Sequence, residues 1–331
     1  MEINNFGFTN FSFDRNIINE RIKSKITLTD FLGLMIALGF AFIFLWNMSH
    51  YNIGAVDIIH SYLPAGSGDY TEFRYHYWIV PIFRILAKLP FLLGYGIWMV
   101  LNIIGVFIAT RIFGGNPILS LASYQLLYVL YYGQITGLLA FGLALAWWAM
   151  SNKRWYLAGT GFLIAATKPQ VGLILGLMLL LLADVSWKER AKILIFPTAI
   201  SFLTLIIWPN WPLTVLLTLI DNPLNTNGNI SLWQWIGPWS LLLFLPAIFL
   251  PLKAKEKIFL NFSAFMLSFP YFQHTGLLIL FCFPVGLLPI LGYLGILRPV
   301  IGWDALKLMF VIPLTLYLIL VIKLLLNRKK L

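Results

Sequence analysis

The sequence predicts an all-α polytopic integral membrane protein, and three observations carry this prediction. Of its 331 residues, 60% are hydrophobic and 11% are charged, with a mean hydropathy of +0.86, far from the composition of a soluble domain. Apolar runs follow one another from residue 26 to residue 326. The basic residues form short clusters beside these runs, as the positive-inside rule describes. The net charge of +11 is therefore attributed to membrane orientation, and nucleic-acid binding is not expected.

The chain divides into a cytoplasmic N-terminal segment, residues 1–25, and one transmembrane domain, residues 26–331. Basic residues precede the first apolar run and no cleavable leader is apparent, so that run is expected to anchor the chain. Each later span is a further apolar run that ends at a basic or polar turn. The expected spans cover residues 26–48, 91–110, 117–132, 135–151, 155–167, 169–183, 193–208, 235–252, 258–272 and 305–326.

The stretch 275–297 is the exception, because a single span there would leave the basic tail at Arg328 outside the cell. A hairpin broken near Pro284 and Pro289 keeps the tail inside. With the hairpin, the count is about ten to twelve transmembrane or re-entrant segments. Two outer loops join the spans, at residues 49–90 and 209–234. In the first, residues 77–90 form a short interface helix, because Arg84 and Lys88 interrupt an otherwise apolar stretch.

Several spans are too short to cross the membrane. The run 155–167 makes roughly 20 Å of helix at about 1.5 Å per residue, whereas the hydrocarbon core is about 30 Å thick. The turn at Lys168, and a similar one at Gln134, should therefore lie at membrane depth. Irregular backbone persists there only where protein or a water-filled cavity covers it. The sequence thus predicts an outward-opening, partly hydrated cavity.

Polar residues at these turns are the candidate site. Asp57 lies in an apolar setting in the first outer loop, and Lys168 needs a negative partner such as a lipid phosphate. An internal salt bridge or a snorkelling side chain is the alternative for Lys168. Arg74 can bind a phosphate bidentately or pair with Glu72. His274 and Gln134 stand at helix ends, where they can cap the helix or contact a ligand.

Short motifs in these segments resemble glycosyltransferase family 87. Asp57-Ile-Ile-His-Ser-Tyr62 is similar to the family's D-hydrophobic-x-x-Y motif, and Gly68-Asp69-Tyr70 with Phe73-Arg74-Tyr75 is similar to its aromatic outer segment. The remaining similar segments are Gly133-Gln134, Ala158-Gly159 and Thr167-Lys168-Pro169, then Asn229-Ile-Ser231-Leu232, then Ser268-Phe-Pro270 with Gln273-His274. They occur in the family's order between residues 55 and about 280.

The resemblance implies a GT-C-type fold and an inverting transfer of mannose or another hexose from a polyprenyl-phosphate donor. The acceptor is a lipid, glycan or protein, and the active site lies on the non-cytoplasmic face of the cell (inner or plasma) membrane. Asp57 is then the catalytic base, and Lys168 with Arg74 binds the donor phosphate. The expected substrate-binding residues are Tyr62, Asp69, Gln134 and His274.

No cofactor is expected. A divalent cation is an alternative that the outer loop does not favour, because Asp57 and Asp69 are 12 residues apart and form no tight D-x-D pair. Two other function classes stay open. Broken spans and polar groups at membrane depth are also typical of a transporter or flippase for a lipid or small solute, and the aromatic-rich composition also suits a non-catalytic structural subunit of a membrane complex.

Overall fold

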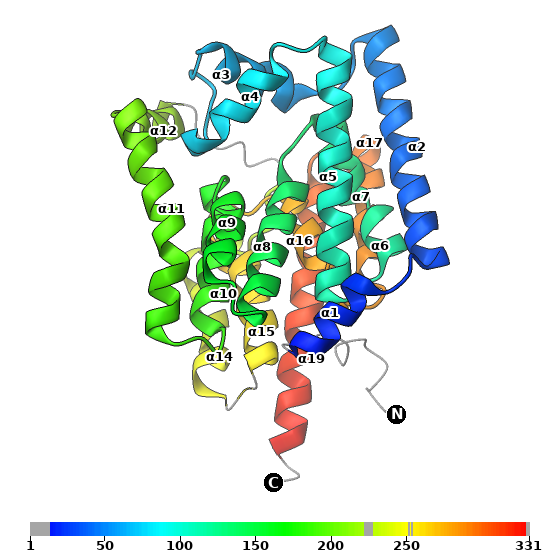
Figure 1. Cartoon of the computed structure of the whole chain (residues 1–331). Helices are drawn as coiled ribbons and strands as arrows, with labels where there is room; N and C mark the ends of the chain where they lie inside the picture. The colour runs from blue at the N-terminus through cyan, green and yellow to red at the C-terminus, as the bar shows by residue number, and fades with distance from the viewer. Residues whose placement is uncertain (1–13, 222–227, 251, 253, 329–331) are drawn as a thin grey trace.

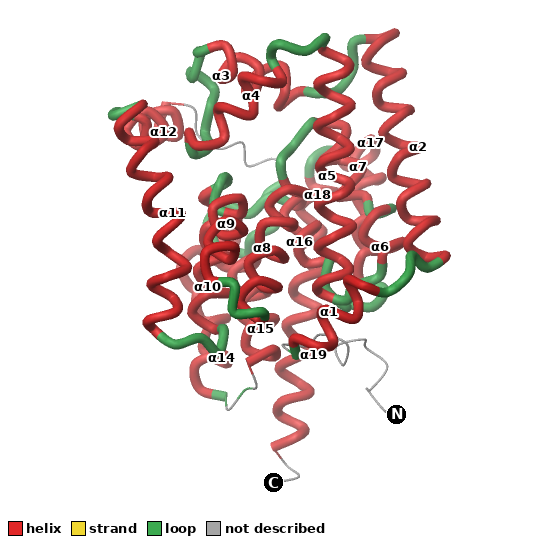
Figure 2. The backbone as a smooth tube through the Cα atoms, in the orientation of Figure 1, coloured by secondary structure: helices red, strands yellow, loops and turns green. Residues whose placement is uncertain are grey.

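The computed structural model describes residues 14–221, 228–250, 252 and 254–328. Within these ranges the chain is helical, and the β-structure is one isolated bridge between Asn229 and Gln273 (Figure 2). Four helices are long and apolar enough to cross a membrane: α2 (Leu28–Tyr51), α5 (Phe91–Phe113), α11 (Trp187–Ile207) and the continuous helix Asp304–Lys323. The all-α polytopic prediction is confirmed.

A fifth apolar unit is bent. Pro117–Tyr132, which contains α6 (Pro117–Leu121) and α7 (Tyr124–Tyr132), meets α8 (Thr136–Ser151) at an angle of 117°. The break falls at Gly133, whose φ of 74° is a left-handed conformation that glycine adopts without steric cost. The two expected spans on either side of Gln134 therefore exist as helices, and the turn between them lies inside the molecule.

Other apolar helices are too short to span. α9 (Trp155–Ala165) has 11 residues, about 16 Å of helix at 1.5 Å per residue. The helix Pro169–Leu182, made of η5 (Pro169–Leu173) and α10 (Ile174–Leu182), follows it. The remaining short apolar helices are Tyr77–Leu86, Trp233–Phe249 and Leu288–Ile301. Further helices are α1 (Arg15–Lys23), α3 (Leu63–Ser67), α12 (Trp211–Asp221), α15 (Ala254–Ser268) and α16 (Leu277–Phe281). α19 (Val311–Arg328) forms most of the spanning helix Asp304–Lys323.

The two ends of the molecule differ (Figure 1). The outer-loop helices α3 and α4 (Val80–Leu86) gather at one end, whereas α1 and the end of α19 lie at the other. A buried ion pair fixes α1 at its end, because Arg111 on α5 lies 3.3 Å from Asp30 and also donates to the carbonyl oxygens of Arg21 and Ser24. The contacts of Arg111 thus tie α1 to α5 and to the start of α2 at this end of the molecule.

The hairpin after His274 is present. α16 ends at Phe281, the chain turns at Gly286 (φ 61°), and η8 (Leu288–Leu297) runs back toward the outer-loop end, where Arg298 donates to the Tyr132 hydroxyl at 3.3 Å. α19 then descends to the end where α1 lies (Figure 1). Lys329 and Lys330 of the basic tail lie outside the described residues, as do residues 1–13 of the N-terminal segment and 222–227 of the second outer loop.

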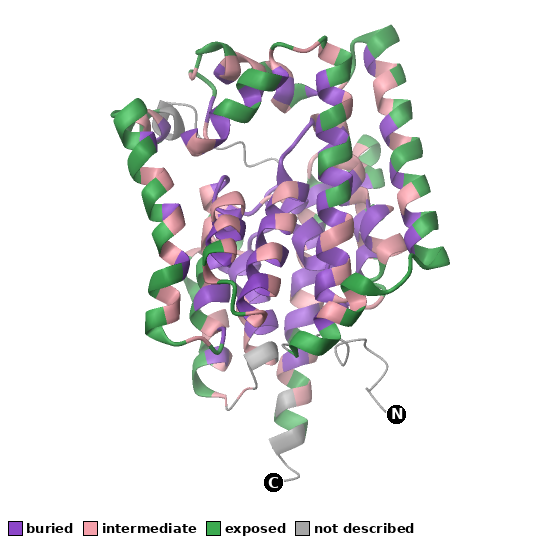
Figure 3. Cartoon of the chain, in the orientation of Figure 1, coloured by how far each residue is buried: buried purple, intermediate pink, exposed green. Residues whose placement is uncertain are grey.

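Buried residues concentrate on α15 and α16 and on α5, α8 and α9, the three central helices of the core (Figure 3). Glycines allow these helices to touch backbone to backbone. A Cβ on Gly105 would lie 2.6 Å from the carbonyl oxygen of Gly137, and one on Gly161 would lie 2.4 Å from the backbone nitrogen of Ala146. Small residues at such contacts are the usual means of packing helices in membranes. By contrast, α2 and α11 expose most of their apolar side chains, as lipid-facing helices do.

The expected interface helix over 77–90 is shorter in the structure. It consists of η4 (Tyr77–Ile79) and α4, which ends at Leu86. α4 packs against α3, since a Cβ on Gly66 would lie 2.4 Å from the Phe83 carbonyl oxygen. The first outer loop is therefore folded, with α3 and α4 packed against each other.

Candidate active site

The outer loop and the turns between the short helices enclose a polar cleft of about 250 Å³. It lies where segments that are far apart in the sequence meet: the start of η3 (Ile58–Tyr62), the strand-like stretch before η4, the turns after α7 and α9, and the loop after α15. The lining residues are Val56, Asp57, His60, Ser61, Glu72, Arg74, Tyr75, Gln134, Lys168, Gln170, Tyr271 and Gln273.

A strained turn directs Asp57 into this cleft. After α2 ends, Asn52, Gly54 and Ala55 all have positive φ values, of 54°, 113° and 53°. Such a conformation costs a non-glycine residue about 1–3 kcal/mol. A hydrogen bond of 2.7 Å from the Ala55 N–H to the carbonyl oxygen of Tyr131 holds the turn against α7. This hydrogen bond fixes the backbone two residues before Asp57 against the end of α7, and so sets the position of Asp57.

Gln134 is positioned by the contact between the turn after α7 and the segment that contains Asp57. Gly133 leaves room for Ile58, because a Cβ there would lie 2.7 Å from the Ile58 Cγ1. The Trp98 indole donates to the Gly133 carbonyl oxygen at 2.8 Å, which satisfies a carbonyl group at the end of α7. Asp57 and Gln134 thus line the cleft from two segments that pack directly on each other.

Lys168 is held by a tight turn and by the outer loop. The turn from α9 into η5 is so close that a Cβ on Gly172 would lie 1.8 Å from the Ala165 carbonyl oxygen. The loop crosses this turn: the His76 N–H donates to the Thr167 carbonyl oxygen at 3.1 Å and the Trp78 indole to the Thr167 hydroxyl at 3.3 Å. Arg74 and Tyr75, just before His76, are thereby brought over Lys168.

The Lys168 side chain is 6% exposed. Within the described part of the chain, no carboxylate lies within ion-pair distance of its ammonium group. The internal salt bridge considered for Lys168 is therefore not formed with any described residue. A buried ammonium without a close partner attracts an anionic ligand strongly.

Asp57 is the carboxylate that faces this charge across the cleft. Burial removes water from the Asp57 carboxylate and raises its pKa to about 6. Attraction to Lys168 and, less strongly, to Arg74 and His60 opposes the shift and does not cancel it. Asp57 is therefore ionised at neutral pH, close to its pKa and without an ion pair among the described residues.

Arg74 lies at the mouth of the cleft. Its guanidinium group is 3.8 Å from the Glu72 carboxylate, and the two side chains are 23% and 52% exposed. An exposed pair of this kind contributes about 0–1 kcal/mol. A phosphate entering the cleft can therefore compete with Glu72 for Arg74.

Four predicted site residues, Asp57, Arg74, Gln134 and Lys168, line the cleft, and three do not. Tyr62 lies beneath it, where its hydroxyl donates to the Tyr75 hydroxyl at 3.2 Å. Asp69 is on the exposed surface and accepts hydrogen bonds from Thr71. His274 is buried behind the cleft.

His274 is 3% exposed and lies edge-to-face against Tyr128, with ring centroids 4.5 Å apart. Neither of its ring nitrogens has a hydrogen-bond partner among the described residues. His274 does not line the cleft. Any effect of this side chain on a bound ligand would therefore act through neighbouring residues.

The eight other lining residues were not predicted as site residues: Val56, His60, Ser61, Glu72, Tyr75, Gln170, Tyr271 and Gln273. Gln170 follows Lys168-Pro169 directly, and Tyr271 with Gln273 lies in the segment after Pro270. Their proximity to the predicted residues was the available signal. Tyr75 and Gln273 also stand in segments that resemble those of the family.

The Asn229-Ile-Ser231-Leu232 segment holds this last loop in place. The Asn229 side chain accepts from the Phe272 N–H at 3.0 Å and donates to the Pro270 carbonyl oxygen at 3.1 Å. Ser231 donates to the Leu267 carbonyl oxygen at 2.9 Å. The motif therefore fixes the backbone from which Tyr271 and Gln273 reach the cleft.

Among the residues that the structure describes, no three histidine, cysteine, aspartate or glutamate side chains gather in a metal-binding arrangement. The absence of a cofactor requirement stays a prediction, as does the alternative of a divalent cation.

Comparison with known proteins gives one match. The model of glycosyltransferase family 87 matches residues 75–247, just over half of the chain. No curated protein and no solved structure matches it. The matched region contains Gln134, Lys168 and the Asn229 motif, whose positions in the fold are given above. The chain belongs to glycosyltransferase family 87.

Proposed function

We propose that the protein transfers a sugar, mannose or another hexose, from a polyprenyl-phosphate donor to a lipid, glycan or protein acceptor with inversion at the anomeric carbon. The reaction would take place on the non-cytoplasmic face of the cell membrane. The main support is the cleft itself, in which the Asp57 carboxylate faces a buried Lys168 ammonium that no described carboxylate neutralises.

In this mechanism Asp57 acts as general base. The acceptor oxygen attacks the anomeric carbon while its proton moves to the Asp57 carboxylate. The bond between the anomeric carbon and the phosphate oxygen breaks on the opposite face, and its electron pair stays on the phosphate. The phosphate leaves as a stable anion, so no general acid is needed and one carboxylate suffices.

The phosphate would lie over Lys168, with Arg74 as a second cation at the mouth of the cleft. Positive groups placed where negative charge develops stabilise the transition state. Lys168 is suited to this role because it is buried, where electrostatic attraction is strong. Arg74 is partly exposed and would make the weaker contribution.

Gln134 would orient the sugar. Its side-chain oxygen is buried and has no hydrogen-bond partner among the described residues, so it can accept a hydrogen bond from a sugar hydroxyl. Tyr62 would act through Tyr75, whose hydroxyl it contacts, and His274 would act as a positioning residue behind the cleft. Asp69 has no part in this arrangement, because it lies outside the cleft.

The test is the substitution Asp57→Asn, which keeps the shape of the side chain and removes its basicity. With a polyprenyl-phosphate sugar and an acceptor present, sugar transfer by this variant is expected to fall at least a hundredfold, in line with the usual contribution of a general base of about 10² to 10⁴. Donor binding should persist. A purified-enzyme assay with radiolabelled sugar measures both.

The matched control is Asp304→Asn, because Asp304 is 72% exposed and pairs with Lys307 away from the cleft. This variant should keep full activity. Normal turnover by a folded Asp57→Asn protein would remove Asp57 as the base. The same assay with and without a chelator tests the cation alternative.

A further inference from the structure

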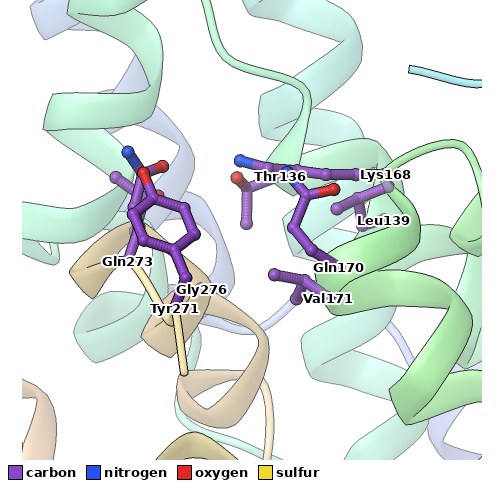
Figure 4. A pocket seen from close by; sticks show the side chains of 9 residues that line it. Thr136, Leu139, Lys168, Gln170, Val171, Tyr271, Gln273 and Gly276 are labelled. Carbon is purple, nitrogen blue, oxygen red and sulfur yellow. The ribbon is translucent and has the colours of Figure 1, made fainter. Parts of the chain in front are cut away.

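A narrow crevice continues from the floor of the cleft. It shares Lys168, Gln170, Tyr271 and Gln273 with the cleft, and Figure 4 shows Thr136, Lys168 and Gln170 on one side with Tyr271 and Gln273 on the other. The full set of lining residues is Thr136, Leu139, Lys168, Gln170, Val171, Tyr271, Gln273, Thr275 and Gly276.

Two threonine hydroxyls in its wall lack a partner. Thr136 and Thr275 are each 1% exposed, and neither hydroxyl makes a hydrogen bond with a described residue. Leaving such a group unsatisfied costs about 1–3 kcal/mol. The crevice has about 0 Å³ of space for a water-sized molecule in the present arrangement of its side chains, so hydration at that position does not satisfy them.

Threonines elsewhere in the membrane region behave differently. Thr110 and Thr204 donate to the carbonyl oxygens four residues earlier, Val106 and Ile200, at 2.8 Å and 2.7 Å. Thr136 is the first residue of α8, so the carbonyl four residues earlier lies outside its helix and is not in line with the hydroxyl. The position of Thr136 at a helix start therefore leaves its hydroxyl available to a ligand.

The surroundings of the crevice favour an anion. α8 begins at Thr136, and the 14-residue helix Pro169–Leu182 begins directly after Lys168. Helix starts carry partial positive charge and bind anions. Lys168 adds a full positive charge, and the set of lining residues contains no carboxylate.

We propose that this crevice binds the phosphate of the donor as the glycosidic bond breaks, with Thr136 and Thr275 donating hydrogen bonds to its oxygens. The inference rests on the proposed function. Binding in this crevice requires Gln170 and Tyr271, which are half-buried at its rim, to rotate and open space for the phosphate oxygens. Because the departing phosphate monoester carries more negative charge than the phosphodiester donor, these hydrogen bonds strengthen along the reaction and lower its barrier.

The experiment compares Thr136→Val and Thr275→Val, which remove each hydroxyl and nearly preserve its shape, with the control Thr204→Val. The probes are polyprenyl phosphate and the uncharged polyprenol of the same chain length. Each crevice variant should bind polyprenyl phosphate about tenfold more weakly, bind polyprenol as the wild type does, and lose more in kcat than it gains in KM. The control should match the wild type.

Unchanged phosphate affinity and kcat in both folded crevice variants would overturn the inference, while a wild-type preference for polyprenyl phosphate over polyprenol would leave the proposed function standing. A wild type that binds the two lipids equally would overturn both. Thr136→Ser and Thr275→Ser keep the hydroxyl and should retain wild-type affinity. Serine variants as weak as the valine variants would assign the effect to packing and reject the crevice as a phosphate site.

Discussion

Asp57 combines two environments that act on its protonation in opposite directions. Burial raises its pKa to about 6, and the cations across the cleft hold it below the value that burial alone would give. A base works best when its pKa lies near the working pH. The residue is thus ionised at neutral pH and still basic enough to accept a proton.

A pH profile tests this environment. Asp57 must be deprotonated to act as a base, so kcat/KM should fall tenfold per pH unit below about pH 6 and level off above it. The measurement is initial transfer rate against pH at low donor concentration. An acidic limb near pH 4, the range of an unburied aspartate, would show that the cleft does not desolvate this carboxylate in the membrane.

Sequence reasoning at the residue scale identified cleft-lining residues where a polar residue was costly. Lys168 and Gln134 stood out because a short apolar run placed each at membrane depth, and both line the cleft. It could not show that Asp69 lies outside the cleft, because an exposed loop residue and a cleft residue have the same local sequence character. His274 shows a different limit, since counting the spans does not reveal that its side chain is buried outside the cleft.

The lengths of the apolar helices could be predicted from the sequence, whereas the residues at which they end were predicted less well. The expected run 155–167 is α9 with its C-terminal turn, and the chain reverses at Lys168 as the length argument requires. The interface helix was expected to reach residue 90 and ends at Leu86. Pro90 disfavours a helical conformation at Leu89, so the helix ends before it and α5 begins after it.

The break between α7 and α8 allows a test at the scale of elements. Gly133→Ala places a methyl group in a left-handed conformation, at a cost of about 1–2 kcal/mol, and drives it against Ile58, one residue from Asp57. We expect a loss of thermal stability and at least a tenfold loss of sugar transfer, measured by calorimetry in detergent and by initial rates.

The control for this change is Gly39→Ala on the lipid-facing side of α2, where a Cβ would meet nothing within 4 Å. Alanine is the better helix former by about 0.5–1 kcal/mol, so this variant should be as stable as the wild type or more so. Equal activity of the two alanine variants would mean that the α7–α8 turn does not set the position of Asp57.

The orientation of the whole molecule can be tested by chemical labelling. Cys282, the one cysteine of the chain, is buried, so an introduced cysteine reports its own surroundings. Glu72→Cys at the cleft should react with an impermeant reagent from outside intact cells. Lys153→Cys should react after permeabilisation, because Lys153 adjoins Asn152, which contacts Asn19 on α1 at the opposite end.

The same labelling separates the function classes. An enzyme with a fixed outward cleft exposes position 72 to one face, whereas a transporter or flippase exposes its binding site to each face in turn. Reaction of Glu72→Cys from both faces would favour the transporter and count against the proposed function.

The glycine contacts among α5, α8 and α9 have a mechanical consequence. Carrying a molecule across a bilayer by rocking one half of a protein against the other requires a seam along which the halves can slide. Here α5, α8 and α9 meet backbone to backbone at Gly105, Gly137 and Gly161, and the Asn102 side chain joins α5 to α8 by accepting a hydrogen bond from the Gly137 N–H at 2.9 Å. A relative shift of these helices would drive their backbones into collision and break that hydrogen bond, so the contacts oppose sliding of α5, α8 and α9 past one another.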